Sequence, residues 1–221
     1  MCKNQSSNSF RVKNSSGLKL VVASFGILCG LTGMIAGVFM VLQGNIPTNG
    51  YVISTIGPEY TMYKDFTYYA ITIVPNFLIS GILAIITSSL VIIWSLRYVH
   101  RRNGALVLLI LSITQMLVGG GWVIDLAIIT FILATRIGKP LEWWSRIIPD
   151  IVQVRLARVF PYSVVGFVLV SLCMLVLTVV GVNSESLIKL LEPLAIVMFF
   201  PIILMTLGGI TVEKKWLMKK N

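Results

Sequence analysis

The sequence predicts an all-α protein, a polytopic bundle of six transmembrane helices with both termini on the cytoplasmic side. Of the 221 residues, 57% are hydrophobic and 12% are charged, whereas soluble domains carry about 25% charged residues. Several apolar stretches reach the length of about 20 residues that a membrane-spanning helix requires. The basic residues flank these stretches, as they do in membrane proteins. These observations exclude a soluble globular protein.

The spans are expected to form a single transmembrane domain, residues 17–212, between a cytoplasmic segment, 1–16, and a basic cytoplasmic tail, 213–221. The first apolar stretch is too long, and begins too far into the chain, for a cleaved signal peptide, so we expect a retained helix. Four stretches qualify as spans by their length and composition alone: residues 17–42, 74–96, 159–182 and 190–210.

The apolar stretch from residue 104 to residue 137 has two interpretations. It is too long for one ordinary span, and a glycine triplet, residues 119–121, lies at its centre. Each glycine inside a helix costs about 1 kcal/mol relative to alanine. The stretch therefore forms either one long broken helix or a hairpin of two short helices, 103–120 and 121–137, joined by a glycine turn.

The distribution of basic residues favours the hairpin, because the two interpretations place the later loops on opposite sides of the membrane. With one broken helix, eight of the 18 basic residues lie inside and ten lie outside. With a hairpin, sixteen lie inside, and only Lys64 and Lys189 lie outside. A re-entrant pair that turns within the membrane gives the same count. We predict two full spans, because each arm approaches the minimal spanning length, and keep the re-entrant hairpin as the alternative.

Two segments in the middle of the chain carry a distinctive pattern. They are Val-Gly-Gly-Gly-Trp-Val-Ile-Asp, residues 118–125, and Ala-Thr-Arg-Ile-Gly-Lys-Pro-Leu-Glu-Trp-Trp, residues 134–144. Residues 41–45 and 75–78 add weaker matches. This pattern resembles a set of small uncharacterised prokaryotic membrane proteins, in which proline follows the glycines where this chain has tryptophan and valine. The resemblance implies a prokaryotic plasma membrane and carries no function.

The first helix has the glycine spacing of a close helix contact. Gly26 with Gly30, and Gly33 with Gly37, form two Gly-x-x-x-Gly pairs. Such pairs allow another backbone to approach, which replaces the hydrophobic driving force that is absent between helices in lipid. We therefore expect this helix at the centre of the bundle, packed within the chain rather than against a second copy.

The two longest loops are expected to lie at the membrane surface. The outer loop, residues 44–66, combines turn formers with tyrosines, which favour the headgroup level, and a lid over a site is the alternative. The inner segment, residues 138–160, combines an apolar stripe with cationic flanks. Such segments bind anionic lipid headgroups, here on the cytoplasmic side. The expected lipid-interface residues are Trp143, Trp144, Arg155 and Arg158.

The sequence offers no catalytic motif. His100 is the only histidine, the three cysteines lack metal-ligand spacing, and no glycine-rich loop follows a strand. The basic residues form no groove interleaved with exposed aromatic side chains, which argues against nucleic acid as a partner. We therefore predict no catalytic residue, no metal and no cofactor.

Polar residues within the spans are the strongest pointer to function, because they are costly there and usually face the bundle interior. Five fall in the predicted outer halves of the spans: Gln43, Asn76, Gln115, Asp125 and Glu192. If they converge, they form a shallow, weakly acidic ligand-binding pocket open to the outside. The alternative is a set of boundary residues and interhelical hydrogen bonds. Asp125 is expected to be the least replaceable of the five.

These features favour a non-catalytic, multi-pass protein of the cell membrane that binds a ligand or a membrane protein partner at its outer face. A small solute or ion transporter or channel is the main alternative, although the sequence shows no convincing repeat between its halves. A membrane-embedded enzyme is the second alternative.

Overall fold

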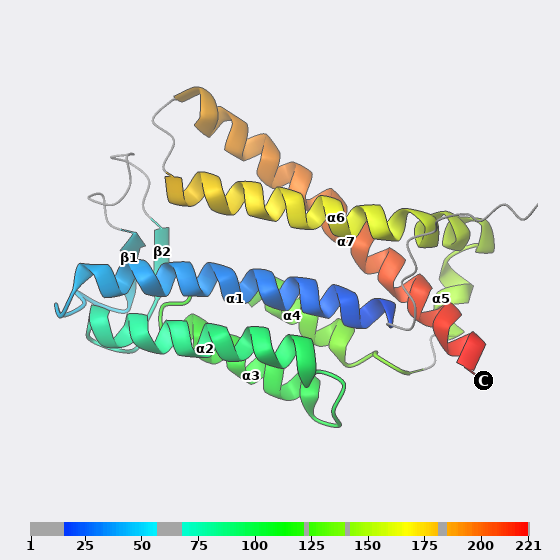
Figure 1. The fold of residues 1–221 in the computed structure, drawn as a ribbon, viewed down its shortest axis with the longest axis horizontal. Helices are drawn as coiled ribbons and strands as arrows, with labels where there is room; N and C mark the ends of the chain where they lie inside the picture. Colours follow the sequence, from blue (N-terminus) through cyan, green and yellow to red (C-terminus); the bar gives the residue numbers. More distant parts are fainter. Residues whose placement is uncertain (1–15, 57–67, 122–123, 140–141, 181–184, 221) are drawn as a thin grey trace, which may run out of the picture.

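The structure, a computed structural model, describes residues 16–56, 68–121, 124–139, 142–180 and 185–220. It is largely helical, with a small two-stranded sheet at one end of the bundle (Figure 1). We call this end the sheet end, and the end at which the chain passes from α2 to α3 the opposite end. The elements are α1 (Gly17–Gln43), β1 (Val52–Ile56), β2 (Tyr68–Ile71), α2 (Phe77–Arg97), α3 (Gly104–Leu117), α4 (Ile124–Ala134), α5 (Glu142–Ile147), α6 (Asp150–Val180) and α7 (Glu185–Lys220).

Four helical segments are long and apolar enough to cross a membrane: Gly17–Gln43, Phe77–Arg97, Asp150–Leu177 and Ile196–Met218. The helices α3 and α4 are apolar but shorter. Large hydrophobic side chains are exposed along the helices, among them Ile86 of α2, Ile110 of α3 and Leu169 of α6. Water would penalise such extensive apolar exposure, whereas lipid does not. The surface is therefore that of a membrane protein.

Helix α1 lies at the centre of the arrangement. It packs against α2, α3 and α4 on one side and against α6 and α7 on the other (Figure 1). Leu18, Val21 and Phe25 of its first turns are completely buried. The ring of Phe25 meets that of Phe167 of α6 edge to face, with 5.1 Å between the centroids.

The four glycines of the two Gly-x-x-x-Gly pairs face neighbouring helices. A β-carbon added at Gly26 would collide with Ser95 of α2, and one at Gly37 would come within 2.9 Å of the carbonyl oxygen of Gly81. At Gly81 itself, the added carbon would lie 2.7 Å from the carbonyl oxygen of Gly37. The backbones of α1 and α2 thus touch where two glycines oppose each other.

The helices α3 and α4 form a hairpin whose turn is the glycine triplet. Gly119 and Gly121 both adopt a φ of 91°, in the left-handed region that favours glycine. The turn approaches the sheet end, because the Ser80 hydroxyl in the first turn of α2 donates to the Val118 carbonyl at 2.6 Å. The hairpin tip thus reaches the level at which α2 begins.

The structure corrects the all-α expectation at the sheet end. Part of the predicted outer loop, 44–66, forms β1, which pairs antiparallel with β2. Pro47 and Asn76 form a further isolated bridge. Backbone groups outside the helices need hydrogen-bond partners when they are buried, and a hairpin sheet supplies them. The sequence lacks a long alternating pattern here, which is why a loop is the natural expectation.

The last two long helices extend beyond the predicted spans. The inner segment, 138–160, and the third span, 159–182, merge into the continuous helix α6, which passes through Pro161. The final span, 190–210, likewise continues as α7 into the basic tail. Proline is tolerated in membrane helices because nearby groups satisfy the freed carbonyls. Pro161 leaves the Ala157 carbonyl without its helical donor, and in the following turn the Ser163 hydroxyl donates to the Phe160 carbonyl at 2.7 Å.

The opposed glycines predict a sharp difference between two alanine substitutions. Gly81→Ala should lower the free energy of unfolding by about 1–3 kcal/mol, because the contact is with backbone that cannot give way. Gly166→Ala in α6 is the control, because no atom lies within 4 Å of its added carbon. It should be neutral or stabilising by up to about 1 kcal/mol. Unfolding in detergent measures both, and equal stability of the two variants would contradict the close contact.

Candidate functional site

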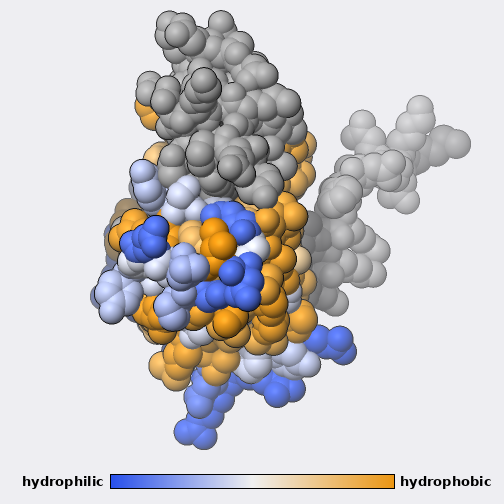
Figure 2. All heavy atoms as spheres, turned by 90° about the vertical axis from the view of Figure 1, so that its left-hand side faces the viewer, coloured by the Kyte–Doolittle hydropathy of each residue, from blue (hydrophilic) through white to orange (hydrophobic). Residues whose placement is uncertain are grey.

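The sheet at the sheet end has one buried face and one exposed face. Ile53 and Ala70 pair across the strands and are 3% and 1% exposed. Val52 and Tyr69, which point the other way, are 62% and 60% exposed. This alternation is that of a strand lying on an apolar surface. Figure 2 looks onto this end and shows polar residues gathered near its centre, with hydrophobic residues beside them.

Polar side chains fasten the sheet end to the helices. The Gln43 amide, at the last residue of α1, donates to the carbonyls of Ser54 and Thr55 at 3.2 and 2.6 Å. Asn76 caps α2, accepting from the Ile79 amide at 3.1 Å. Its own amide nitrogen donates to the Asn45 side chain at 2.7 Å. Two of the five predicted binding residues therefore fasten parts of the segment 45–55.

A pocket of about 330 Å³ opens beside the sheet and is lined by Thr48, Gly50, Tyr51, Thr72, Ile73, Val74 and Pro75. None of these residues is charged, and none belongs to the predicted acidic cluster. Hydrogen bonds fix its walls: the Thr72 amide donates to the Tyr51 carbonyl at 2.8 Å, and the Thr48 amide to the Pro75 carbonyl at 3.3 Å. The Tyr51 ring is 74% exposed at the rim. The pocket can hold a neutral, partly apolar group.

The structure does not bring Gln115 to the sheet end with Gln43. Gln115 is fully buried, and its amide donates to the Cys29 carbonyl of α1 at 2.7 Å. Cys29 lies about 21 Å along the α1 axis from Gln43, at 1.5 Å per residue. The position of Gln115 along the chain predicts a place near the outer end. Its long side chain instead reaches back from the hairpin turn toward the middle of α1.

The two acidic members of the predicted cluster are placed differently. Asp125 lies in the first turn of α4, where a carboxylate is favoured by the helix dipole. It is exposed and close enough to Cys29 for electrostatic interaction. Glu192 falls on α7, but its side chain lies outside the described residues.

Two buried polar atoms lack hydrogen-bond partners in the middle of the bundle. They are the Ser88 hydroxyl and the Gln115 side-chain carbonyl. Both side chains crowd against Gly33, where an added β-carbon would strike Gln115 and Ser88. Gly33 therefore makes the space that the Ser88 and Gln115 side chains occupy beside α1.

A buried carboxylate at the start of the predicted tail organises the opposite end. Glu213 of α7 is fully buried and accepts a hydrogen bond from the Ser16 hydroxyl. It also accepts from the Leu18 amide at 3.4 Å and from the Gly138 amide at 3.0 Å. The carboxylate lies at the amino terminus of α1, where the helix dipole stabilises negative charge. One residue thus joins α1, α7 and the segment after α4.

The four predicted lipid-interface residues have different surroundings. The prediction that Trp144 lies at the lipid interface is wrong. Its side chain is 4% exposed, and its indole donates to the Thr211 hydroxyl of α7 at 3.1 Å. Packing of α5 against α7 covers the ring, so it cannot anchor in lipid. Arg155 and Arg158 are exposed on α6, as an interface requires. The side chain of Trp143 lies outside the described residues.

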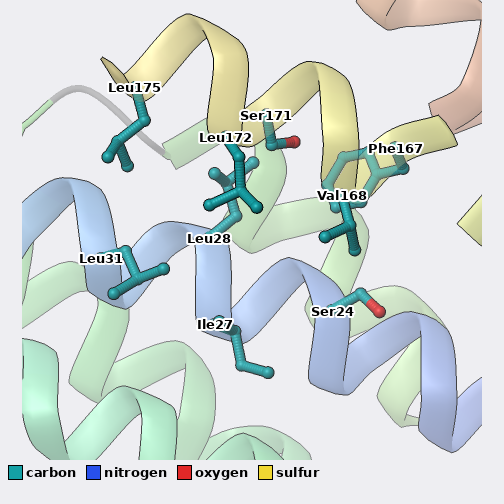
Figure 3. A pocket seen from close by; sticks show the side chains of 9 residues that line it. All are labelled: Ser24, Ile27, Leu28, Leu31, Phe167, Val168, Ser171, Leu172 and Leu175. Carbon is teal, nitrogen blue, oxygen red and sulfur yellow. The ribbon is translucent and has the colours of Figure 1, made fainter. Parts of the chain in front are cut away.

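An apolar hollow of about 90 Å³ separates α1 from α6 (Figure 3). Leucine and valine side chains line most of it, and the hydroxyls of Ser24 and Ser171 are its polar groups. Ser24 donates to the Leu20 carbonyl of its own helix at 2.9 Å, whereas the Ser171 hydroxyl has no partner. The hollow is small, open and almost entirely apolar.

Comparison with known proteins adds no identity. No family model matches the chain, and neither a curated protein nor a solved structure matches it. Within the part of the chain that the structure describes, no three His, Cys, Asp or Glu side chains group as metal ligands would. The candidate sites therefore rest on their own geometry.

Removing the charge of Glu213 should destabilise the junction of α1 and α7. Glu213→Gln should cost about 1.5–3 kcal/mol, because hydrogen bonds to a charged group are lost in a buried site. Combined with Ser16→Ala, the two losses should be less than additive, because the residues share one interaction. The control Lys215→Gln, at an exposed neighbour, should change stability by less than about 0.5 kcal/mol. Additive losses would show that Ser16 and Glu213 act separately.

Proposed function

We propose that this chain is a six-span protein of the cell membrane, in a prokaryote the plasma membrane, with both termini in the cytoplasm. It binds a ligand or a membrane protein partner at its outer face, the sheet end, and catalyses no reaction. Anionic headgroups contact its cytoplasmic end, including exposed Arg155 and Arg158.

The position of the hairpin tip supports six spans. Helix α2 has 21 residues and so extends about 31 Å, the thickness of a bilayer core. The hairpin begins beside the end of α2, and its turn meets Ser80 in the first turn of α2. Helices α3 and α4 extend about 21 and 16 Å. The glycine turn at one end and, at the other, the turn after α4, where the Gly138 amide donates to Glu213, bring the hairpin close to the depth of α2. The distribution of basic residues orients the sheet end outward.

The preorganised sheet end is the observation that carries the binding proposal. The side chains of Gln43, Asn76 and Ser80 bond to Thr55, Asn45 and Thr72, while Tyr51 and Tyr69 are left exposed. Exposed tyrosines on a fixed backbone lose little conformational entropy on binding, which is why such residues dominate recognition surfaces. The neutral pocket beside the sheet suits an apolar side chain of a partner or a small uncharged ligand.

Cysteine labelling tests the topology. In a variant without Cys2, Cys29 and Cys173, single cysteines are placed at Asn49, Arg146 and Lys215, which are all exposed. We expect only the Asn49 site to react with an impermeant thiol reagent in intact cells, and all three after permeabilisation. External labelling at Arg146 or Lys215 would contradict the six-span topology.

Site-specific photo-crosslinking tests the binding face. A photoreactive amino acid at Tyr51 or Tyr69 should give a discrete protein or ligand adduct in native membranes. The controls are Ile110 and Ile132, which are exposed on α3 and α4 and should give only lipid adducts. The Thr72→Trp substitution fills the pocket and should reduce the adduct at Tyr51 at least about tenfold, the effect of losing about 1.4 kcal/mol. The same weak adducts at all four positions would contradict outer-face binding.

Asp125 gives the transporter or channel alternative its specific support. An exposed carboxylate on an apolar helix is costly and usually marks a solute pathway. Proton or cation flux in liposomes distinguishes the two proposals. Flux that Asp125→Asn abolishes would replace the binding proposal, whereas equal leak from wild-type and variant liposomes would leave binding as the function.

A further inference from the structure

A second pocket lies at the opposite end of the bundle, far from the sheet end. Its volume is about 420 Å³, within the range of small-molecule sites. The turn between α2 and α3 forms one wall and the end of α4 with the following turn forms the other. Its lining residues are Val99, His100, Arg101, Arg102, Asn103, Ala105, Leu106, Phe131, Ala134, Thr135, Ile137 and Lys139.

The rim of this pocket is cationic. Arg101, Arg102 and Lys139 contribute three positive charges. Among the residues that the structure describes, no acidic side chain lines the pocket, so no described carboxylate there neutralises this charge. Arginine and lysine are the side chains that bind phosphate groups, arginine through two parallel hydrogen bonds.

Helix α3 points its amino terminus into the same pocket. It begins at Gly104, and the side chain of Asn103 makes no capping hydrogen bond. The first amide groups of a helix lack intrahelical partners and carry the positive end of the dipole. The Gly104 amide is already engaged with the Arg101 carbonyl, so an anion between the two arginines and the amides of Ala105 and Leu106 would receive both charge and hydrogen bonds.

The turn that carries the arginines is held in one conformation. The amide of Arg101 donates to the Tyr98 carbonyl at 3.1 Å, and that of Gly104 to the Arg101 carbonyl at 2.8 Å. The Trp94 indole donates to the Gly104 carbonyl at 2.9 Å. The Arg101 guanidinium lies 4.7 Å from the centre of the Tyr98 ring, a cation–π contact. These hydrogen bonds and the cation–π contact distinguish the turn from a mobile basic flank.

Apolar side chains extend the pocket along the bundle. Phe131 and Ala134 of α4 and Leu106 of α3 line it, and Leu106 is 53% exposed. These residues continue toward the apolar surfaces of the two short helices. A ligand with a phosphate at the rim and a hydrocarbon chain along the helices would match both parts.

We propose that this pocket binds a phosphate group, held by Arg101, Arg102 and Lys139 against the amino terminus of α3. The group belongs either to an anionic phospholipid or to a soluble phosphate compound, and the apolar wall favours the phospholipid. The inference does not depend on outer-face binding, because it concerns the other end of the molecule.

Calorimetric titration of the protein in detergent tests the proposal with two probes, dihexanoylphosphatidic acid and inorganic phosphate, at constant ionic strength. We expect saturable binding of the short-chain lipid and weaker binding of phosphate. Comparable binding of both probes would assign the site to a soluble phosphate compound and still support the proposal. Binding of neither probe would overturn it.

A charge-matched pair of variants shows whether binding occurs in the pocket. Arg101→Gln, Arg102→Gln and Lys139→Gln together should weaken binding at least about tenfold, since each hydrogen bond to a charged group is worth that much. The control combines Arg97→Gln, Arg136→Gln and Arg146→Gln, which remove the same charge from exposed residues outside the pocket. Equal losses in both triple variants would overturn the site in favour of general surface attraction.

Asn103 provides a test that preserves the fold. Aspartate and serine are both favoured before a helix, so Asn103→Asp and Asn103→Ser should each keep α3 intact. Only the aspartate places a negative charge beside the proposed phosphate. It should weaken binding about tenfold, whereas the serine variant should bind like the wild type. Unchanged binding by the aspartate variant would overturn the proposal even if the triple variant does not fold.

Discussion

The backbone contact between α1 and α2 is the constraint on which the rest of the structure depends. Gly37 and Gly81 oppose each other so closely that an added β-carbon at either would lie within 2.9 Å of the other's carbonyl oxygen. In lipid, helices associate through packing and hydrogen bonds rather than through burial of apolar surface. The glycines bring α1 close enough to α2 for both to contact the hairpin of α3 and α4, which Gln115 then joins to the Cys29 carbonyl.

Polar groups at the two ends of the bundle give it two different surfaces. At the sheet end, Gln43 bonds to the strand β1 and Asn76 to Asn45, and tyrosines are exposed beside them. At the opposite end, Glu213 joins α1 to α7 and to the turn after α4, and arginines line a pocket in which the structure describes no acidic side chain. Hydrogen bonds that are shielded from water hold their geometry well, because an unpaired group there is costly. Each surface is therefore fixed before any ligand binds.

Prediction from the sequence succeeded where a pattern is local and periodic. The four long apolar helices and the glycine turn follow from composition and from the low helix propensity of residues 119–121. It failed where a side chain reaches a partner far along the chain. The Trp144 ring looked like an interfacial anchor, but Thr211 of α7 receives its hydrogen bond. Gln115 was assigned to the outer pocket, but its partner lies near the middle of α1.

The sequence by itself determined that the chain suits a membrane, where its long helices lie, and that α1 has a glycine face. Apolar length and residue spacing decide these features because both act within one segment. Only the tertiary structure decided which polar residues meet. Glu213 and Ser16 are 197 residues apart, and the cationic pocket combines the turn after α2 with the end of α4. Such contacts depend on the relative placement of separate helices, and no periodicity within a single helix encodes that placement.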